Sequence, residues 1–332
     1  MGKGRILVDA AITIAVYVAV FWLIGPESLF FALEGANLLF LALAILAYCA
    51  MNLLMSLRVS AILGKMGYKI GARQILPSHL AGMLASDFTP ARAGYFFTAF
   101  SLSQRFKLRI EKTLLAILCP QLLDFLIKVV SAAALAIFAF GPLLPGHPII
   151  NASIILAFLA GVLSAALLIF HPSALSLLSF LKAAPYAKQI FLLLHRIRAH
   201  SGALYYLKWK IAAITLLSWL AKGAEWLFIS YSLGISIYGN VFQDFAFMML
   251  FQAAITLLQF IPLPTIAGAG ATEAAFAALL LPLGVAPAKG VAFGLLTRIV
   301  VLPIDSFGFP LLSSSIKSKG FNKEIRRVTG FD

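Results

Sequence analysis

Long apolar runs recur along this sequence, and a run of this kind can fold in few ways. The first, Ile6–Ile24, is about as long as the ~20 residues that a helix needs to cross a bilayer. In lipid the backbone must satisfy its own hydrogen bonds, which favours helices. The chain is 62% hydrophobic and only 11% charged, with a mean hydropathy of +0.99. A soluble domain is about half apolar and a quarter charged. We therefore expect an all-α polytopic membrane protein.

Basic residues lie mainly in short loops between the apolar runs. The net charge of +14 therefore indicates cytoplasmic loops rather than a nucleic-acid partner. Arg58, Lys65, Lys69 and Arg73 follow one run, whereas the loop with Glu27 and Glu34 has no base. This pattern predicts an integral protein of the plasma membrane, with both termini in the cytoplasm. The predicted spanning helices cover residues 6–24, 36–57, 113–140, 149–170, 211–233 and 291–312.

A broken apolar segment at Leu84–Tyr95 contains an acid, a base, a proline and a glycine. We expect Thr89 to cap a helix that starts at Pro90, with Arg92 in its first turn. Free N–H groups and a guanidinium at a helix start form an anion site. The arms 74–86 and 91–102 hold about 12 residues each, too few to cross a bilayer. Bases lie on both sides of them, so residues 74–102 are predicted to form a re-entrant hairpin from the cytoplasm.

A second broken segment, Phe260–Glu273, contains two prolines followed by Gly268 and Gly270, which allow tight backbone. Its arms 242–260 and 272–281 are read as a second re-entrant hairpin, with direct spanning as the alternative.

Together the segments predict an inverted repeat within one transmembrane domain of residues 1–332, a construction that secondary transporters use. The first repeat covers residues 1–140 and the second 149–312. Residues 173–210 form a cytoplasmic linker with an amphipathic helix at about 186–207 (a solvated charged linker is the alternative), and 313–332 form a basic cytoplasmic tail.

Ionisable side chains within apolar segments are the candidate functional residues, because each costs about 3 kcal/mol to insert. They are Asp87, Arg92, Asp124, Lys128, Lys222, Glu225, Glu273, Arg298 and Asp305. The spacing of Asp124 from Lys128, and of Lys222 from Glu225, allows each pair to neutralise itself. A structural role for these four is as plausible as charge relay or gating. Asp305 is read as structural.

Three of these residues lie at or near a predicted helix break. For Arg92 the alternatives are a salt bridge to Asp87 and a bidentate contact with a phosphate, together with Thr89, Gly268, Gly270 and Arg298. Glu273 is expected to pair with Arg298 or Arg92, or to carry a proton. A Glu273–Arg298 pair would join the second broken segment to the last helix, where alternating access needs a latch.

The sequence offers no sign of catalysis. Cys49 and Cys119 lie in apolar runs and are expected to be packing residues. The five histidines have no metal-ligand spacing, and no Walker loop or nucleophile elbow is present. We therefore expect no enzyme, no metal and no cofactor.

Three stretches resemble a known family: M-N-L-L-M-S-L-R-V-S-A-I-L followed by D-F-T-P-A-R-A-G, then I-P-L-P-T-I-A-G-A-G-A-T-E, and finally G-V-A-P-A-K-G-V-A-F-G-L-L-T-R-I-V. They are similar to the transmembrane region of lysylphosphatidylglycerol synthases, over residues 36–312. The resemblance implies a flippase-like module, and Arg92, Glu273 and Arg298 match the family's charged positions. The aminoacyl-transfer domain of the two-domain members is not found in this sequence.

The first hypothesis is a flippase for an anionic phospholipid or polyprenyl-phosphate lipid. The alternatives are a proton-coupled transporter of a soluble anion, a membrane enzyme acting on a lipid phosphate, and a membrane partner of a lipid-modifying enzyme. The protein partners considered are a second copy of the chain and such an enzyme.

Overall fold

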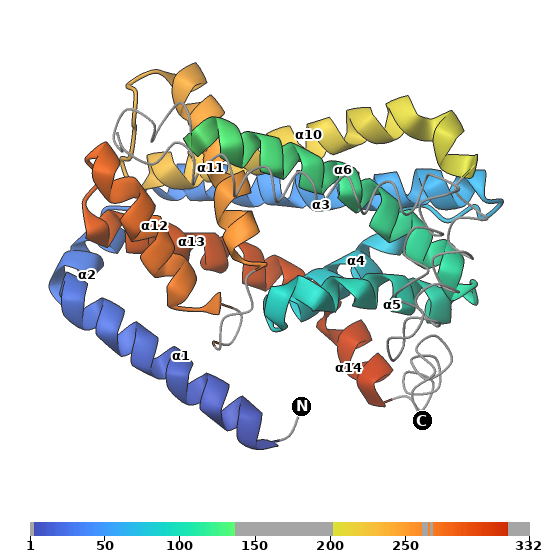
Figure 1. Ribbon diagram of the computed structural model, residues 1–332, viewed down its shortest axis with the longest axis horizontal. Helices are drawn as coiled ribbons and strands as arrows, with labels where there is room; N and C mark the ends of the chain where they lie inside the picture. The colour runs from blue at the N-terminus through green and yellow to red at the C-terminus, as the bar shows by residue number, and fades with distance from the viewer. Residues whose placement is uncertain (1–2, 137–201, 261–264, 266–267, 318–332) are drawn as a thin grey trace, which may run out of the picture.

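The computed structural model describes residues 3–136, 202–260, 265 and 268–317. Every regular element in these residues is a helix, as predicted (Figure 1). The elements are α1 (Lys3–Ile24), α2 (Pro26–Glu34), α3 (Leu38–Lys65), α4 (Ala72–Asp87), η1 (Pro90–Tyr95), α5 (Phe96–Phe106), α6 (Ile110–Leu135), α10 (Gly202–Ser232), α11 (Val241–Leu258), α12 (Ala271–Leu280), η6 (Leu281–Leu283), α13 (Pro287–Asp305), η7 (Ser306–Gly308) and α14 (Phe309–Lys317).

Five of the described helical stretches are long and apolar enough to cross a membrane, and a bent pair is a candidate sixth. The five are Leu38–Lys65, Ile110–Leu135, Tyr206–Ser232, Val241–Leu258 and Pro287–Ser314. The protein is thus an integral membrane protein of the predicted class. The predicted span 149–170 and most of the linker lie outside the described residues, and the inverted repeat stays a prediction.

The first predicted span differs from expectation at its outer end. Ala11–Ile24 and Pro26–Glu34 meet at 84°, so the expected loop with Glu27 and Glu34 is a helix. Gly25 adopts φ +82°, and Pro26 starts α2 at a position where its missing N–H costs nothing. The sequence pattern predicted that the first span ends at Ile24, but it did not predict that helix α2 follows.

Asparagine side chains start two of the spanning helices. The Asn37 side chain accepts a hydrogen bond from the Leu39 N–H at 2.9 Å, and Asn240 accepts from Phe242 N–H at 2.9 Å. These bonds satisfy N–H groups that have no partner within the helix. They fix the starts of α3 and α11 next to long apolar runs.

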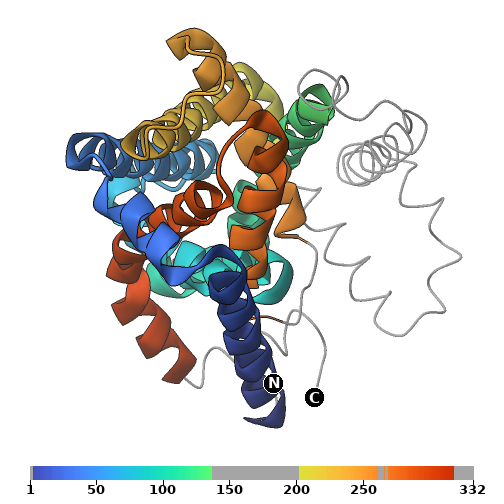
Figure 2. The ribbon, with the colours of Figure 1, turned by 90° about the vertical axis from the view of Figure 1, so that its left-hand side faces the viewer.

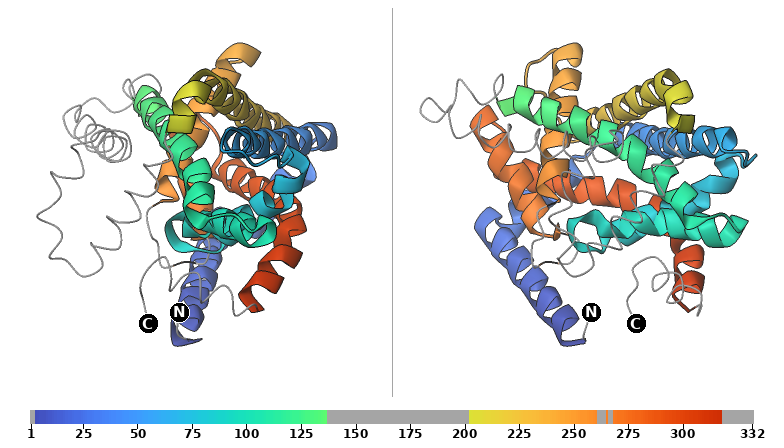
Figure 3. Two further views of the ribbon diagram at one scale, coloured as in Figure 1. Left: turned by 90° about the vertical axis from the view of Figure 1, so that its right-hand side faces the viewer. Right: turned by 45° about the vertical axis from the view of Figure 1, so that its right-hand side comes forward.

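Helices α3 and α10 pack along each other, and α6 packs against α11 (Figure 1). The hairpin of α4 and α5 lies beneath them, next to α13. Helices α1 and α14 project from one side of the bundle (Figures 2 and 3). Helix α11 has the length to span and α12 has only 10 residues, which favours the alternative of direct spanning by residues 242–260.

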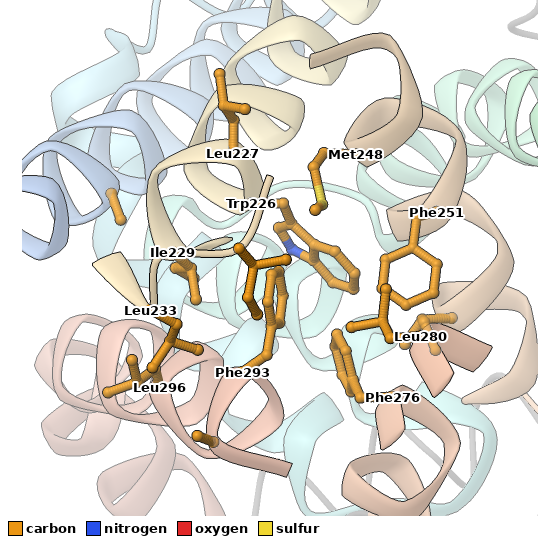
Figure 4. Packing of buried hydrophobic residues seen from close by; sticks show 14 of the residues in the cluster. Trp226, Leu227, Ile229, Leu233, Met248, Phe251, Phe276, Leu280, Phe293 and Leu296 are labelled. Atoms are coloured by element: carbon orange, nitrogen blue, oxygen red, sulfur yellow. The ribbon is translucent and has the colours of Figure 1, made fainter. Parts of the chain in front are cut away.

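An aromatic cluster joins α10, α11, α12 and α13. The Trp226 ring lies 5.7 Å from that of Phe251, 5.0 Å from that of Phe276 and 5.4 Å from that of Phe293, between ring centroids (Figure 4). Tilted and edge-to-face pairs of this kind stabilise beyond their buried area, by about 0.5–1.5 kcal/mol each. The cluster fixes the four helices that form one side of the candidate site.

The α4–α5 hairpin packs closely because glycine lines its contact. A Cβ at Gly94 would overlap the backbone of Ala85 and Ser86, and one at Gly82 would overlap Thr98. The second helix of this hairpin, α5, begins at Phe96 and not at Pro90 as predicted. Residues 90–95 form a 3-10 helix instead. The tip of the hairpin is therefore a short 3-10 helix that joins α4 to α5, and not the capped start of an α-helix.

Candidate functional site

A cavity of about 420 Å³ lies inside the bundle, between the hairpin tip and the second broken segment. Its volume falls within the range of about 300–1,000 Å³ that is usual for ligand pockets. Eight residues of the predicted site line it: Asp87, Thr89, Arg92, Asp124, Lys128, Lys222, Gly268 and Arg298. Glu225, Gly270 and Glu273 are not among the lining residues. Segments far apart in the sequence therefore meet at one site, as the two broken segments predicted.

Arg92 has both a salt bridge and a contact across the cavity. Its Nη2 lies 3.3 Å from Oδ1 of Asp87, which is the salt bridge considered from the sequence. Its Nη1 donates to Oε1 of Gln259 at 3.0 Å, which joins the hairpin tip to the end of α11. Arg92 does not lie in the first turn of an α-helix, because it occupies the 3-10 turn with φ +55°.

Thr89 has a different role from the predicted helix cap. Its hydroxyl accepts a hydrogen bond from the Gly94 N–H at 2.6 Å and donates to the Ala85 carbonyl at 3.0 Å. The side chain therefore closes the hairpin tip rather than capping a helix that starts at Pro90. The predicted α-helix start at Pro90 is therefore wrong, and an anion site at this tip stays a prediction.

Glu273 and Arg298 form the predicted pair. Arg298 Nε contacts Oε1 of Glu273, which also accepts from the Tyr17 hydroxyl at 3.4 Å. Oε2 accepts from the Gly270 N–H at 2.7 Å, where Gly270 has φ +79°. Glu273 is fully buried. The carboxylate therefore caps α12 and balances the charge of an arginine that lines the cavity.

Lys222 and Glu225 also form the predicted local pair, with 2.8 Å between Nζ and Oε2. The ammonium lies 4.9 Å from the centroid of the Tyr48 ring, a cation–π contact. Glu225 is fully buried behind Lys222. The pair therefore places the cation at the cavity and the acid behind it.

Asp124 pairs with a residue that the sequence placed in a loop. Its Oδ2 lies 2.9 Å from Nη2 of Arg58, and its Oδ1 accepts from Nη1 at 3.0 Å. Nη1 also donates to Oγ1 of Thr215 at 2.8 Å. Arg58 is 2% exposed because α3 continues to Lys65. The local ion pair of Asp124 with Lys128 that the spacing allowed is not among the salt bridges of the described residues. The signal in the sequence was an arginine immediately after an apolar run.

Lys128 differs from the other cations of the cavity. Within the described part of the chain it has no carboxylate in salt-bridge contact, whereas Arg92, Lys222 and Arg298 each have one. It lines the cavity one turn beyond Asp124. A ligand with a negative charge is the partner that best suits this ammonium.

Asp305 is buried beside another acid, Asp87, and the phenol of Tyr48. The Tyr48 hydroxyl donates to both of its carboxylate oxygens, at 2.9 and 2.8 Å. The carboxyl of Asp87 lies against that of Asp305, and Oδ2 of Asp87 has no donor among the described residues. Asp305 thus has a neighbour that sequence spacing did not reveal.

The charges around the cavity nearly balance. The acids are Asp87, Asp124, Glu225, Glu273 and Asp305, and the cations are Arg58, Arg92, Lys128, Lys222 and Arg298. The five acids and five cations are equal in number, and among the described residues Lys128 is the cation of this group that has no carboxylate in salt-bridge contact. Among the described residues, no group of three potential metal-ligating side chains occurs. The arrangement suits a polar, singly negative ligand.

The comparisons with known proteins identify one family. The family described as "Lysylphosphatidylglycerol synthase TM region" matches residues 6–305. Searches of curated proteins and of solved structures found no match. The matched range includes both broken segments and every residue that lines the cavity.

Proposed function

From the premise that this chain belongs to the family of the lysylphosphatidylglycerol synthase TM region, we propose that it is a lipid flippase. The family indicates a function related to membrane lipids. The proposed substrate is an anionic phospholipid or a polyprenyl-phosphate lipid. The observation that carries the proposal is a cavity inside an apolar bundle whose lining includes two arginines and two lysines. Charged groups in membrane segments usually mark a substrate path.

The phosphate is proposed to bind between Arg92 and Arg298, with Lys128 as a further positive charge. A guanidinium presents donors in a planar fork that fits phosphate oxygens. The acyl or prenyl chains remain in the surrounding lipid. The lipid crosses unchanged, so the protein acts as a transporter and not as an enzyme. Chemical turnover of the lipid by purified protein would contradict this assignment.

Two polar contacts at the cavity could break and re-form as the helices move during transport. Arg92 contacts Gln259, the residue that caps the end of α11, and Arg298 on α13 contacts Glu273 on α12. Each joins residues from different elements at the cavity. Exchange of these contacts for a phosphate would couple headgroup binding to a change in the helix arrangement.

Arg92→Ala should lower the transport of headgroup-labelled anionic lipid in proteoliposomes by about ten- to hundredfold, because a charge-assisted hydrogen bond contributes about 1.5–3 kcal/mol. A membrane-impermeant quencher reports the lipid that remains in the outer leaflet. The matched control is Arg105→Ala, on the same hairpin but exposed and absent from the cavity lining. Equal transport by Arg92→Ala and Arg105→Ala would remove Arg92 from the site.

The contact of Asp87 with Asp305 supports a second candidate, a proton-coupled transporter of a soluble anion. We expect Asp305→Asn to abolish the dependence of transport on a proton gradient, since a neutral amide cannot share a proton with Asp87. The amide oxygen can still accept from Tyr48. Transport should be measured with and without a gradient, with the exposed Glu27→Gln as control. Gradient dependence that survives in Asp305→Asn would exclude this pair as the coupling site.

The location of the termini follows from the same proposal. Helices α1 and α14 project from one side of the bundle, and basic residues follow Lys317 in the sequence. This supports a plasma-membrane protein with both termini in the cytoplasm. A second copy of the chain or a lipid-modifying enzyme remains the proposed protein partner, with no role for nucleic acid.

A further inference from the structure

Three of the candidate spanning stretches terminate at the same end of the bundle. They are Leu38–Lys65, Ile110–Leu135 and Tyr206–Ser232. The Lys65 ammonium lies 5.1 Å from the centroid of the Tyr206 ring, and Lys112 Nζ donates to the Tyr68 hydroxyl at 3.1 Å. The end of α3 and the starts of α6 and α10 therefore lie together, on the right in Figure 1. A spanning helix leaves the bilayer where its apolar stretch terminates, so this end lies at one surface of the membrane.

Bases greatly outnumber acids at this end, which we call the basic end. Residues 65–75, 104–112 and 206–210 contain nine lysines and arginines but one acid, Glu111. Eight of the nine bases are exposed, and Lys112 is half-buried. At the opposite end, helix α2 has two exposed acids, Glu27 and Glu34, and no base. The exposed charge of the basic end therefore suits an anionic partner.

Exposed aromatic side chains at the basic end indicate that this partner is lipid. On α10, Trp209 is 79% and Tyr206 is 76% exposed. The two are three residues apart, so they share one face of the helix. Lysines lie against both rings, because Lys208 Nζ is 5.8 Å from the centroid of Trp209 and Lys65 is beside Tyr206. Tryptophan and tyrosine gather at the headgroup layer of a membrane, since each combines an apolar ring with one polar group. The neighbouring lysines therefore lie at the level of the headgroups.

The charge of the headgroup decides which lipid these lysines favour. An ammonium can only donate hydrogen bonds, and phosphate oxygens accept them. Phosphatidylcholine has a cation as well as a phosphate and is neutral overall, whereas phosphatidylglycerol is anionic. Each base near an anionic leaflet strengthens binding by about fivefold. Salt screens this attraction when the charges are exposed.

We propose that Lys65, Lys208 and Lys210, together with the rings of Tyr206 and Trp209, form a surface site for anionic phospholipid in the leaflet at the basic end. None of these five residues lines the cavity. The site goes beyond the proposed flippase function, because the lipid bound there lies on the outside of α10 and is not the transported lipid. It holds anionic lipid whether or not the protein moves lipid between leaflets.

The test uses Trp209 as a reporter of the lipid next to it. The full chain with Trp22→Phe is reconstituted in mixtures of phosphatidylcholine and phosphatidylglycerol, in which one of the two lipids is brominated at the top of its acyl chains and quenches the tryptophan that it contacts. Brominated phosphatidylglycerol should quench about fivefold more per mole than brominated phosphatidylcholine. Raised salt should lower this preference, and Lys208→Gln with Lys210→Gln should remove most of it.

The matched control is Trp209→Phe, which leaves Trp22 as the reporter. Trp22 is 81% exposed on α1, next to the acidic helix α2 at the opposite end (Figure 1). It should show no preference for phosphatidylglycerol. An equal preference at Trp22 and Trp209 would overturn the site, as would a preference that survives the two lysine substitutions.

Two further outcomes separate this site from the alternatives. Equal quenching of Trp209 by the two lipids would overturn the site and leave the exposed bases to an acidic protein partner. Arg92→Ala changes the cavity and should keep the preference at Trp209. Loss of the preference in Arg92→Ala would assign it to the cavity and overturn the surface site. Failure of lipid transport with the preference intact would contradict the flippase alone.

Discussion

Asp124→Leu should destabilise the protein by about 3–5 kcal/mol, the usual effect of removing one partner of a buried ion pair. The variant leaves the guanidinium of Arg58 buried on α3 without its counter-charge. Thr215 can still accept one hydrogen bond from it, but no described acid takes over the charge. Helices α3 and α6 would lose their ionic contact.

The double variant Arg58→Met with Asp124→Leu should recover most of that loss, because two apolar side chains leave no unpaired charge. Unfolding can be followed through the buried Cys119 thiol, in a Cys49→Ser background that removes the exposed thiol. A double variant less stable than Asp124→Leu would show that Arg58 stabilises the protein even without Asp124. Asp124→Leu within 1 kcal/mol of the parent would contradict the argument.

Glu273→Gln should destabilise the protein by about 3 kcal/mol and also abolish lipid transport. The amide oxygen of glutamine can still accept from the Gly270 N–H, so the cap of α12 is retained and only the charge is lost. The fully buried carboxylate is the described counter-charge of Arg298 at the cavity. Removal of one partner leaves the other charge poorly compensated.

Thr272→Ala is the control for this variant, since it changes the neighbouring residue of α12. It removes a hydrogen bond from Oγ1 to the Gly268 carbonyl, for which we expect about 1 kcal/mol and continued transport. Thermal unfolding and the proteoliposome assay should be measured on the same preparations. Normal transport by Glu273→Gln would mean that the pair with Arg298 does not act as a latch.

The sequence predicted the class of the fold and the neighbourhood of the site, because both depend on local signals. Apolar runs mark helices wherever they occur, and the breaks at Leu84–Tyr95 and Phe260–Glu273 mark irregular backbone. Proline and glycine set the conformation there whatever the rest of the chain does. The meeting of Arg92, Glu273 and Arg298 around one region follows from those breaks and from the resemblance to a family.

Pairing between distant residues could not be read in the same way. Arg58 follows Leu57 directly at the end of an apolar run, which is also how a cytoplasmic loop begins. Its partner Asp124 is 66 residues away, and Lys128 was the nearer choice by helical spacing. Asp124 pairs with Arg58 because the folded protein packs α3 against α6. Asp87 and Asp305 are also far apart in the sequence, so their contact could not be predicted from local sequence patterns.

The bond from Arg92 to Gln259 has a consequence for how often the cavity changes shape. It joins the hairpin tip to α11 through a single charged donor and a neutral acceptor. A bond of this type contributes about 1.5–3 kcal/mol. If this bond acts alone, molecules in which Arg92 is bound to Gln259 outnumber those in which it is free by about ten- to hundredfold. A population of roughly one to ten molecules in a hundred would then have the tip released at any moment, which is frequent enough for a lipid phosphate to compete for the arginine.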